Sequence, residues 1–284
     1  MRNFTFKGLF LAIVFIVLGS LSIQAADGLI TKQITIKLEK AGTLPDKIGS
    51  TKKKQITNLK IIGEINGTDL RMIREMAGKD VRDNDTDGML SVLDLSDAKI
   101  VEGGDYYYTD YPYYSTYYST SNDKIGDYTF YGCSVLTSLT LPSGLTEIGY
   151  GTFSGCSGLT SITLPSGVTE IGELAFNRCS GLTSIYVYTE KLPKMGRSVF
   201  EDCDAKKCTV YVPKGTYDDY WLSEFGYFEN IVEFDPTGIN NVITSNDAKE
   251  LSRYSLNGQR LSAPTKGLNI VKYSDGSVKK VAIQ

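Results

Sequence analysis

IGYGTFSGCSGLTSITLPSGVTE, residues 148–170, decides the fold of this 284-residue chain. Nearly the same pattern stands before it at 125–147 (IGDYTFYGCSVLTSLTLPSGLTE) and after it at 171–194 (IGELAFNRCSGLTSIYVYTEKLPK). A diverged copy, MGRSVFEDCDAKKCTVYVPKGT, begins at Met195. The copies start 23, 23 and 24 residues apart. A period in the range of about 20 to 50 residues is the sequence mark of a solenoid or array, in which stacked units bury one continuous core.

Each copy contains the same structural parts. The apolar positions are Leu136, Leu139, Leu141; Leu159, Ile162, Leu164; and Leu182, Ile185, Val187. The last two of each set alternate with polar residues, which predicts a strand with one buried face. Pro-Ser-Gly at 142–144 and 165–167 predicts a turn, with a glycine that is free to adopt positive φ. Ile-Gly and a phenylalanine then supply a second inward set, so stacking in register would place Leu139, Ile162 and Ile185 side by side.

The series F-x-x-C-x-x-L-x-x-[LI]-x-[LV] resembles the BspA-like leucine-rich repeat of surface proteins from Bacteroides-type bacteria. The resemblance covers about residues 59–234 and is strongest at 125–215. It implies a mainly β fold, namely a short curved parallel-β leucine-rich-repeat solenoid. We expect an N-terminal cap helix, a C-terminal aromatic cap and a small β-rich C-terminal module. The family is chiefly implicated in adhesion and protein–protein contact, and these roles are expectations for this chain.

The chain divides into seven predicted segments. They are a signal peptide (1–25), an N-terminal cap with diverged repeats (26–100), a Tyr-rich insertion (101–124), the repeats (125–215), a C-terminal cap (216–236), a linker (237–249) and a β tail (250–284). The cap helix is expected to begin at Thr68 and stop at Gly78. The tail has Asn257-Gly258 and Asp275-Gly276 hairpin signals. It resembles the C-terminal β-domains of exported Bacteroidetes proteins, so a sorting signal and a plain β-module both remain open.

The N-terminus predicts export. Arg2 and Lys7 precede an apolar run from Gly8 to Ile23, and small residues follow at Ala25. This arrangement is typical of a secretory signal. The alternative is a membrane anchor, although the run is shorter than the roughly 20 residues of a membrane span. We therefore expect a secreted or cell-surface protein whose mature chain does not span a membrane.

Composition excludes several kinds of function. The chain has no histidine, which rules out Ser-His-Asp and Cys-His catalysis and histidine-ligated metals. Its net charge of −3 gives no basic surface for nucleic acid. No carboxylate pair falls where a cleft is expected, since Asp218-Asp219 is better explained as a helix start. We predict a protein that is not an enzyme and has no required cofactor, with calcium as the one possibility.

Four cysteines recur at the same place in the repeat. Cys133, Cys156, Cys179 and Cys203 each follow the repeat phenylalanine by three residues. Without a C-x-x-C motif or a histidine they do not match a metal site. Burial as free thiols is the preferred interpretation. A disulfide between Cys203 and Cys208 is the alternative.

An acidic stretch gives the calcium hypothesis. Asp83, Asp85, Asp87 and Gly88 match the first half of a D-x-D-x-D-G calcium loop, and Asp94 falls at the twelfth position. Oxygen ligands at alternate residues can wrap a hard cation. A strand follows here in place of the second helix of the motif, so a solvated acidic turn is the competing interpretation.

Tyrosines supply the candidate contact residues. The insertion reads YYYTDYPYYSTYY at 106–118 and contributes Tyr106, Tyr107, Tyr108, Tyr111, Tyr113, Tyr114, Tyr117 and Tyr118. On the repeat strands, Ser138, Thr140, Ser161 and Thr163 should point outward, followed by Tyr186, Tyr188 and Tyr211. Tyrosine offers a large amphipathic contact area at low entropic cost. The expected partner is an extracellular protein or host surface component, and a glycan is the alternative. Packing back onto the solenoid is the competing interpretation.

Overall fold

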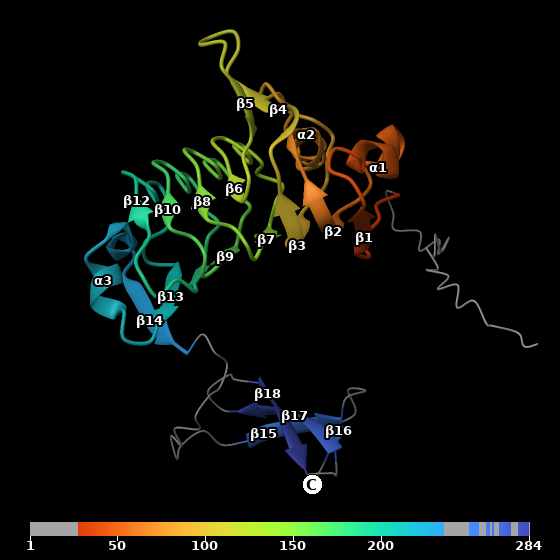
Figure 1. Ribbon diagram of the computed structural model, residues 1–284. Coiled ribbons are helices and arrows are strands. Elements are labelled where there is room, and N and C mark those ends of the chain that lie inside the picture. The colour runs from red at the N-terminus through yellow and green to blue at the C-terminus, as the bar shows by residue number, and fades with distance from the viewer. Residues whose placement is uncertain are drawn as a thin grey trace, which may run out of the picture. The chain divides into compact units, whose positions relative to one another are not determined.

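The computed structural model describes residues 28–235, 250–255, 260–261, 263, 267–273 and 278–283 (Figure 1). The chain divides into two compact units, Met1–Phe234 and Asp235–Gln284. The expected signal peptide, the linker and both tail hairpin turns lie outside the described residues. Within the described part, no helix is long and apolar enough to cross a bilayer.

One long parallel sheet runs through the first unit. Its strand order is β1-β2-β3-β7-β9-β11-β13-β14. The strands are β1 (Ile34–Leu38), β2 (Asn58–Ile65), β3 (Val92–Ile100), β7 (Ser138–Thr140), β9 (Ser161–Leu164), β11 (Ser184–Val187), β13 (Thr209–Pro213) and β14 (Asn230–Phe234). Leu139 pairs with Ile162, and Ile162 pairs with Ile185. The predicted parallel-β leucine-rich-repeat fold is confirmed, with its leucines adjacent in one core.

A second, short sheet stacks the Ile-Gly segments. Its strands are β6 (Lys124–Ile125), β8 (Glu147–Ile148), β10 (Glu170–Ile171) and β12 (Lys194–Met195), in the order β12-β10-β8-β6. The phenylalanines that follow form a buried column. Neighbouring ring centroids in the series Phe130, Phe153, Phe176 and Phe200 lie 5.7, 5.0 and 5.6 Å apart. Each coil therefore places a phenylalanine ring at the equivalent position of the core.

The glycine of Ile-Gly is required by close approach. A Cβ built on Gly172 would lie 2.6 Å from the carbonyl carbon of Gly149 in the preceding coil, which real Cβ atoms do not tolerate. The predicted Pro-Ser-Gly turns are formed, but neither Gly144 nor Gly167 uses the positive φ that glycine allows. These turns are closed by a hydrogen bond such as Leu145 N–H to Pro142 C=O at 3.1 Å. A type I turn of this kind needs no left-handed residue.

All five cysteines are free and buried. The thiol of Cys156 donates to the Phe130 carbonyl at 3.1 Å, and the thiol of Cys179 donates to the Phe153 carbonyl at 3.1 Å. Cys203 makes the same contact with Phe176. The thiols therefore link one coil to the next, and the disulfide alternative is not formed.

The N-terminal cap contains two helices, α1 (Leu44–Lys52) and α2 (Gly67–Met76). Asn66 caps α2 by accepting from the backbone N–H of Thr68, and the Asp69 carboxylate accepts from the backbone N–H of Asn66. Asp69 also accepts from Leu44 N–H at 2.9 Å. Leu70, Ile73 and Met76 are buried on one face of α2, as their spacing predicts. One buried carboxylate thus joins the start of α2 to the start of α1.

The C-terminal cap consists of helix α3 (Tyr217–Trp221), a 3-10 turn (Glu224–Tyr227) and β14. Tyr220, Phe225 and Phe228 are fully buried and close the end of the core. Tyr217 and Trp221 stack on each other at the surface, with centroids 6.1 Å apart. The tail unit is an antiparallel sheet of β15 (Glu250–Ser255), β16 (Arg260–Leu261), β17 (Gly267–Tyr273) and β18 (Val278–Ile283), in the order β16-β15-β17-β18.

Candidate binding surfaces

The Tyr-rich insertion forms a β-hairpin. Strands β4 (Gly103–Thr109) and β5 (Tyr117–Thr120) pair antiparallel, and the hairpin projects beyond the coils of the solenoid (Figure 1). Its eight tyrosines divide among a buried base, a partly exposed flank and an exposed tip. The division matters because the buried base tyrosines are not available to a partner.

The base of the hairpin belongs to the core. Tyr107 and Tyr108 are buried, and burial raises the pKa of both phenols to about 12. The hydroxyl of Tyr107 donates to the Asp127 carbonyl at 3.0 Å. The Tyr108 ring stacks on Tyr128 of the first coil at 5.0 Å and lies 5.7 Å from Tyr118. Tyr107 and Tyr108 were expected among the contact residues, and this placement corrects that expectation.

Arg74 of α2 joins the helix, the hairpin and the first coil. Its side chain is fully buried, and Nη1 donates to the carbonyls of Tyr128 and Thr129, both at 2.9 Å. Nη2 donates to the Asp80 carbonyl at 3.1 Å. The guanidinium also lies 5.0 Å from the Tyr108 ring centre. Sequence reasoning missed Arg74, because a single arginine on a helix gives no signal of burial.

The tip of the hairpin presents its aromatic rings to solvent. Tyr113 and Tyr114 are 85% and 82% exposed. The loop beneath them is held by the Thr116 N–H, which donates to the Asp110 carboxylate at 2.7 Å. The Arg82 guanidinium lies 5.6 Å from the ring of Tyr111. The exposed rings therefore stand on a hydrogen-bonded support.

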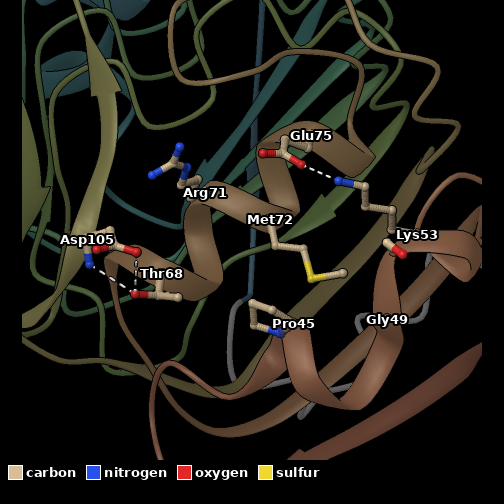
Figure 2. Close-up of a pocket in the computed structure, with 9 residues that line it drawn as sticks. Pro45, Gly49, Lys53, Thr68, Arg71, Met72, Glu75 and Asp105 are labelled. Atoms are coloured by element: carbon tan, nitrogen blue, oxygen red, sulfur yellow. Dashed lines mark hydrogen bonds and ion pairs between the residues drawn. The ribbon is translucent and has the colours of Figure 1, made fainter.

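The lower flank of the hairpin borders a groove between α1 and α2 (Figure 2). Tyr106 and Tyr117 meet edge to face at 4.9 Å, and the Arg71 guanidinium lies 5.4 Å from the Tyr106 ring centre. The groove holds about 350 Å³, and Lys53 and Glu75 form a 2.5 Å ion pair on its wall. Because these wall charges neutralise each other, the groove offers little net field to a charged ligand.

The outward strand tyrosines gather at the C-terminal end of the long sheet. The rings of Tyr186 and Tyr211 stack at 4.6 Å with 7° between their planes. Tyr188 meets Phe234 edge to face at 5.2 Å. Phe234 and the exposed Val232 were not predicted among the candidate contact residues, because β14 was not predicted as a strand.

The acidic stretch is not assembled as a calcium loop. Lys79 Nζ lies 3.0 Å from Asp85 and 3.5 Å from Asp83, and the Asp83 pKa is raised chiefly by burial. Asp87 pairs with Lys54 at 2.6 Å, and Asp94 lies on β3 in an ion pair with Lys60. Among the described residues, no three acidic, cysteine or histidine side chains converge as metal ligands. The expected ligands Asp83, Asp85, Asp87 and Asp94 are thus each engaged by a lysine.

The repeat region matches a known family model. Residues 103–220 match, in six copies, the model of the family described as "BspA type Leucine rich repeat region". A crystal structure of a leucine-rich repeat protein from Bacteroides ovatus is similar at 24% sequence identity and a TM-score of 0.38. The match covers 64% of this chain and 43% of that one, so the chain spans less than half of the length of that relative. No curated protein matches the sequence.

Proposed function

Starting from a chain that carries BspA-type leucine-rich repeats over residues 103–220, we propose an exported, non-enzymatic module that binds an extracellular protein with the tip of its tyrosine hairpin. The observation that carries the proposal is the exposure of Tyr113 and Tyr114 above a fixed base. Exposed aromatic side chains are enriched at the energetic centres of protein interfaces. The signal-like N-terminus supports export of the chain.

The rigidity of the base favours recognition over a passive loop. Tyr108, Tyr118 and Tyr128 pack against one another, so little conformational freedom is left below the tip. Binding with a pre-ordered aromatic pair costs less entropy than binding with a mobile segment. The hairpin therefore resembles a preformed binding loop.

The absence of histidine supports a non-catalytic role. The thiols among the described residues are buried, and burial raises their pKa, so they are poor nucleophiles. Repeats of this kind offer an extended surface and not a preorganised pocket. These points support a surface that binds rather than one that reacts.

The test uses the mature chain, residues 26–284, on an array of purified extracellular proteins. We expect at least one protein to bind, and the double variant Tyr113→Ser, Tyr114→Ser to weaken that binding about tenfold or more. Tyr217→Ser is the matched control, because Tyr217 is an exposed tyrosine on the C-terminal cap. Equal binding by the tip variant and the wild type would exclude the hairpin as the contact.

A further inference from the structure

The outward face of the last five strands of the long sheet carries no charge. The register aligns two outward rows across β7, β9, β11, β13 and β14. The first row consists of Ser138, Ser161, Ser184, Thr209 and Asn230. The second row consists of Thr140, Thr163, Tyr186, Tyr211 and Val232. Charged residues make up 22% of the chain, so ten neutral positions in register set this surface apart. We refer to these ten positions as the neutral face.

The strand beside the neutral face carries charge, and there one lysine is shared by two carboxylates. Asp94 of β3 is aligned with Thr140. Lys60 of β2 bonds to Asp94 at 2.9 Å and to Asp97 at 2.7 Å. The border of the neutral face therefore presents an ion-paired cluster with one negative charge in excess, which disfavours an anionic ligand. A ligand that matches this surface electrostatically is uncharged.

The hydroxyls of the neutral face are not used within the protein. Beside it, Thr160 and Thr183 donate their hydroxyls to the carbonyl of the preceding coil at 2.9 and 3.0 Å. Across the described residues, the side-chain oxygens of Ser138, Thr140, Ser161, Thr163 and Ser184 have no such intramolecular partner. Three adjacent strands, β7, β9 and β11, thus offer unused donors and acceptors in a regular array.

An aromatic ring stands at the edge of this hydroxyl array. One side of the Tyr186 ring is covered by Tyr211, at 4.6 Å and nearly parallel. The residue aligned with its other side is Thr163, whose side chain is too short to cover a ring. Adjacent strands lie about 4.8 Å apart, which is the spacing of stacked rings. A flat ligand ring above Thr163 would therefore continue the stack of Tyr186 and Tyr211.

We infer that the neutral face binds a neutral oligosaccharide, with the C–H face of one sugar ring against Tyr186 and its hydroxyls toward Thr140 and Thr163. A sugar combines an apolar ring face with many hydroxyl groups and no charge, and the face offers the complement of each. Serine and threonine are poorly represented at the energetic centres of protein interfaces, which favours a sugar over a protein here. This site is separate from the hairpin tip.

Affinity electrophoresis in native gels tests the inference. The mature chain is run through gels containing β-glucan, mannan, xylan or galactan, with polygalacturonate as an anionic comparison. We expect at least one neutral polysaccharide to retard the chain. Tyr186→Ala should weaken retardation about tenfold, whereas Tyr186→Phe, which keeps the ring, should retain it.

A second variant separates loss of the site from loss of the fold. Thr163→Tyr places a ring of the protein itself in the vacant stacking position, so we expect it to abolish retardation with an unfolding midpoint no lower than that of the wild type. The double variant Tyr113→Ser, Tyr114→Ser should be retarded as much as the wild type. A failure of the hairpin tip to bind protein can therefore be distinguished from a failure of the neutral face to bind polysaccharide.

Three results would overturn the inference. One is the lack of retardation by every neutral polysaccharide. Another is unchanged retardation of both Tyr186→Ala and Thr163→Tyr. The third is loss of a protein partner, in place of a polysaccharide, when Tyr186 is replaced by alanine, which would assign the neutral face to protein recognition.

Discussion

The guanidinium of Arg74 lies 5.0 Å from the centre of the Tyr108 ring while its Nη1 atom donates to two carbonyls of the first coil. One side chain thus fixes the hairpin base relative to the solenoid. We expect Arg74→Met to lower the free energy of unfolding by about 3 kcal/mol, because one buried and two partly buried carbonyls lose their donor. Arg71→Met, one turn earlier and without these bonds, should cost about 0.5 kcal/mol or less. Urea unfolding measures both, and similar losses would contradict the role given to Arg74.

A pair of glycines tests the close approach between coils. Gly172→Ala should destabilise the protein by about 2 kcal/mol or more, because the new methyl group would overlap the backbone of Gly149. Gly144→Ala is the matched substitution, since a Cβ at that position would meet no atom within 4 Å and the φ of Gly144 is not positive. There we expect no loss, or a gain of about 0.5 kcal/mol from a less flexible unfolded chain. Thermal unfolding of the two variants distinguishes these outcomes.

The cysteine column predicts a decline of stability in alkali. Burial raises the pKa of Cys133 to about 11 and that of Cys203 to about 12, against roughly 8.5 for an unfolded cysteine. The folded state therefore holds protons that the unfolded chain releases. The resulting stabilisation is complete below pH 8 and is lost as pH rises through the folded values. The urea midpoint should fall between pH 9 and about 11, and Cys133→Ala should flatten that fall.

The same burial predicts unreactive thiols. At pH 8 a disulfide reagent should modify the folded protein far more slowly than the urea-unfolded chain, because the thiolate is the reacting form. Absorbance of the released thiol counts the reacting groups. Rapid modification of Cys156 or Cys179 in the folded protein would contradict their place in the core.

Calcium should leave the unfolding temperature unchanged. Asp83 and Asp85 share the Lys79 ammonium group, and Asp87 pairs with Lys54, so a cation would have to displace these lysines. The measurement is a thermal melt in millimolar calcium after chelation, with magnesium as the comparison. An unfolding temperature that rises with calcium but not with magnesium, and that no longer rises in Asp85→Asn, would support the calcium-loop hypothesis.

The repeat could be predicted because its apolar residues recur at fixed positions, and burial in a shared core accounts for that recurrence. Leu139, Ile162 and Ile185 recur with one period and alternate with hydroxyl residues, so both the strand and its buried face follow from the pattern. The helix at Gly67–Met76 was predicted from apolar spacing and a following glycine. β1, α1 and β14 were missed, since each occurs once and therefore has no repeat to reveal it.

The tyrosine hairpin marks the limit of sequence reasoning. Tyrosine is amphipathic, so the run 106–118 looks alike whether a ring is buried or exposed. Burial of Tyr107 depends on Gly126, where a Cβ would lie 2.4 Å from its hydroxyl oxygen. Burial of Tyr108 depends on Arg74, which is 34 positions away in the chain. Such long-range contacts are absent from the local pattern.

Because inward and outward positions alternate along each strand, the outer surface can change while the packing of the core stays the same. Between β9 and β11 the inward residue stays isoleucine, at Ile162 and Ile185, while the outward residue changes from Thr163 to Tyr186. Substitution on the outer row leaves the inward packing of each coil as it was. Duplicating or exchanging one coil would therefore change one set of outward side chains at a time. The surface that contacts a ligand could change during evolution while the solenoid that supports it stayed the same.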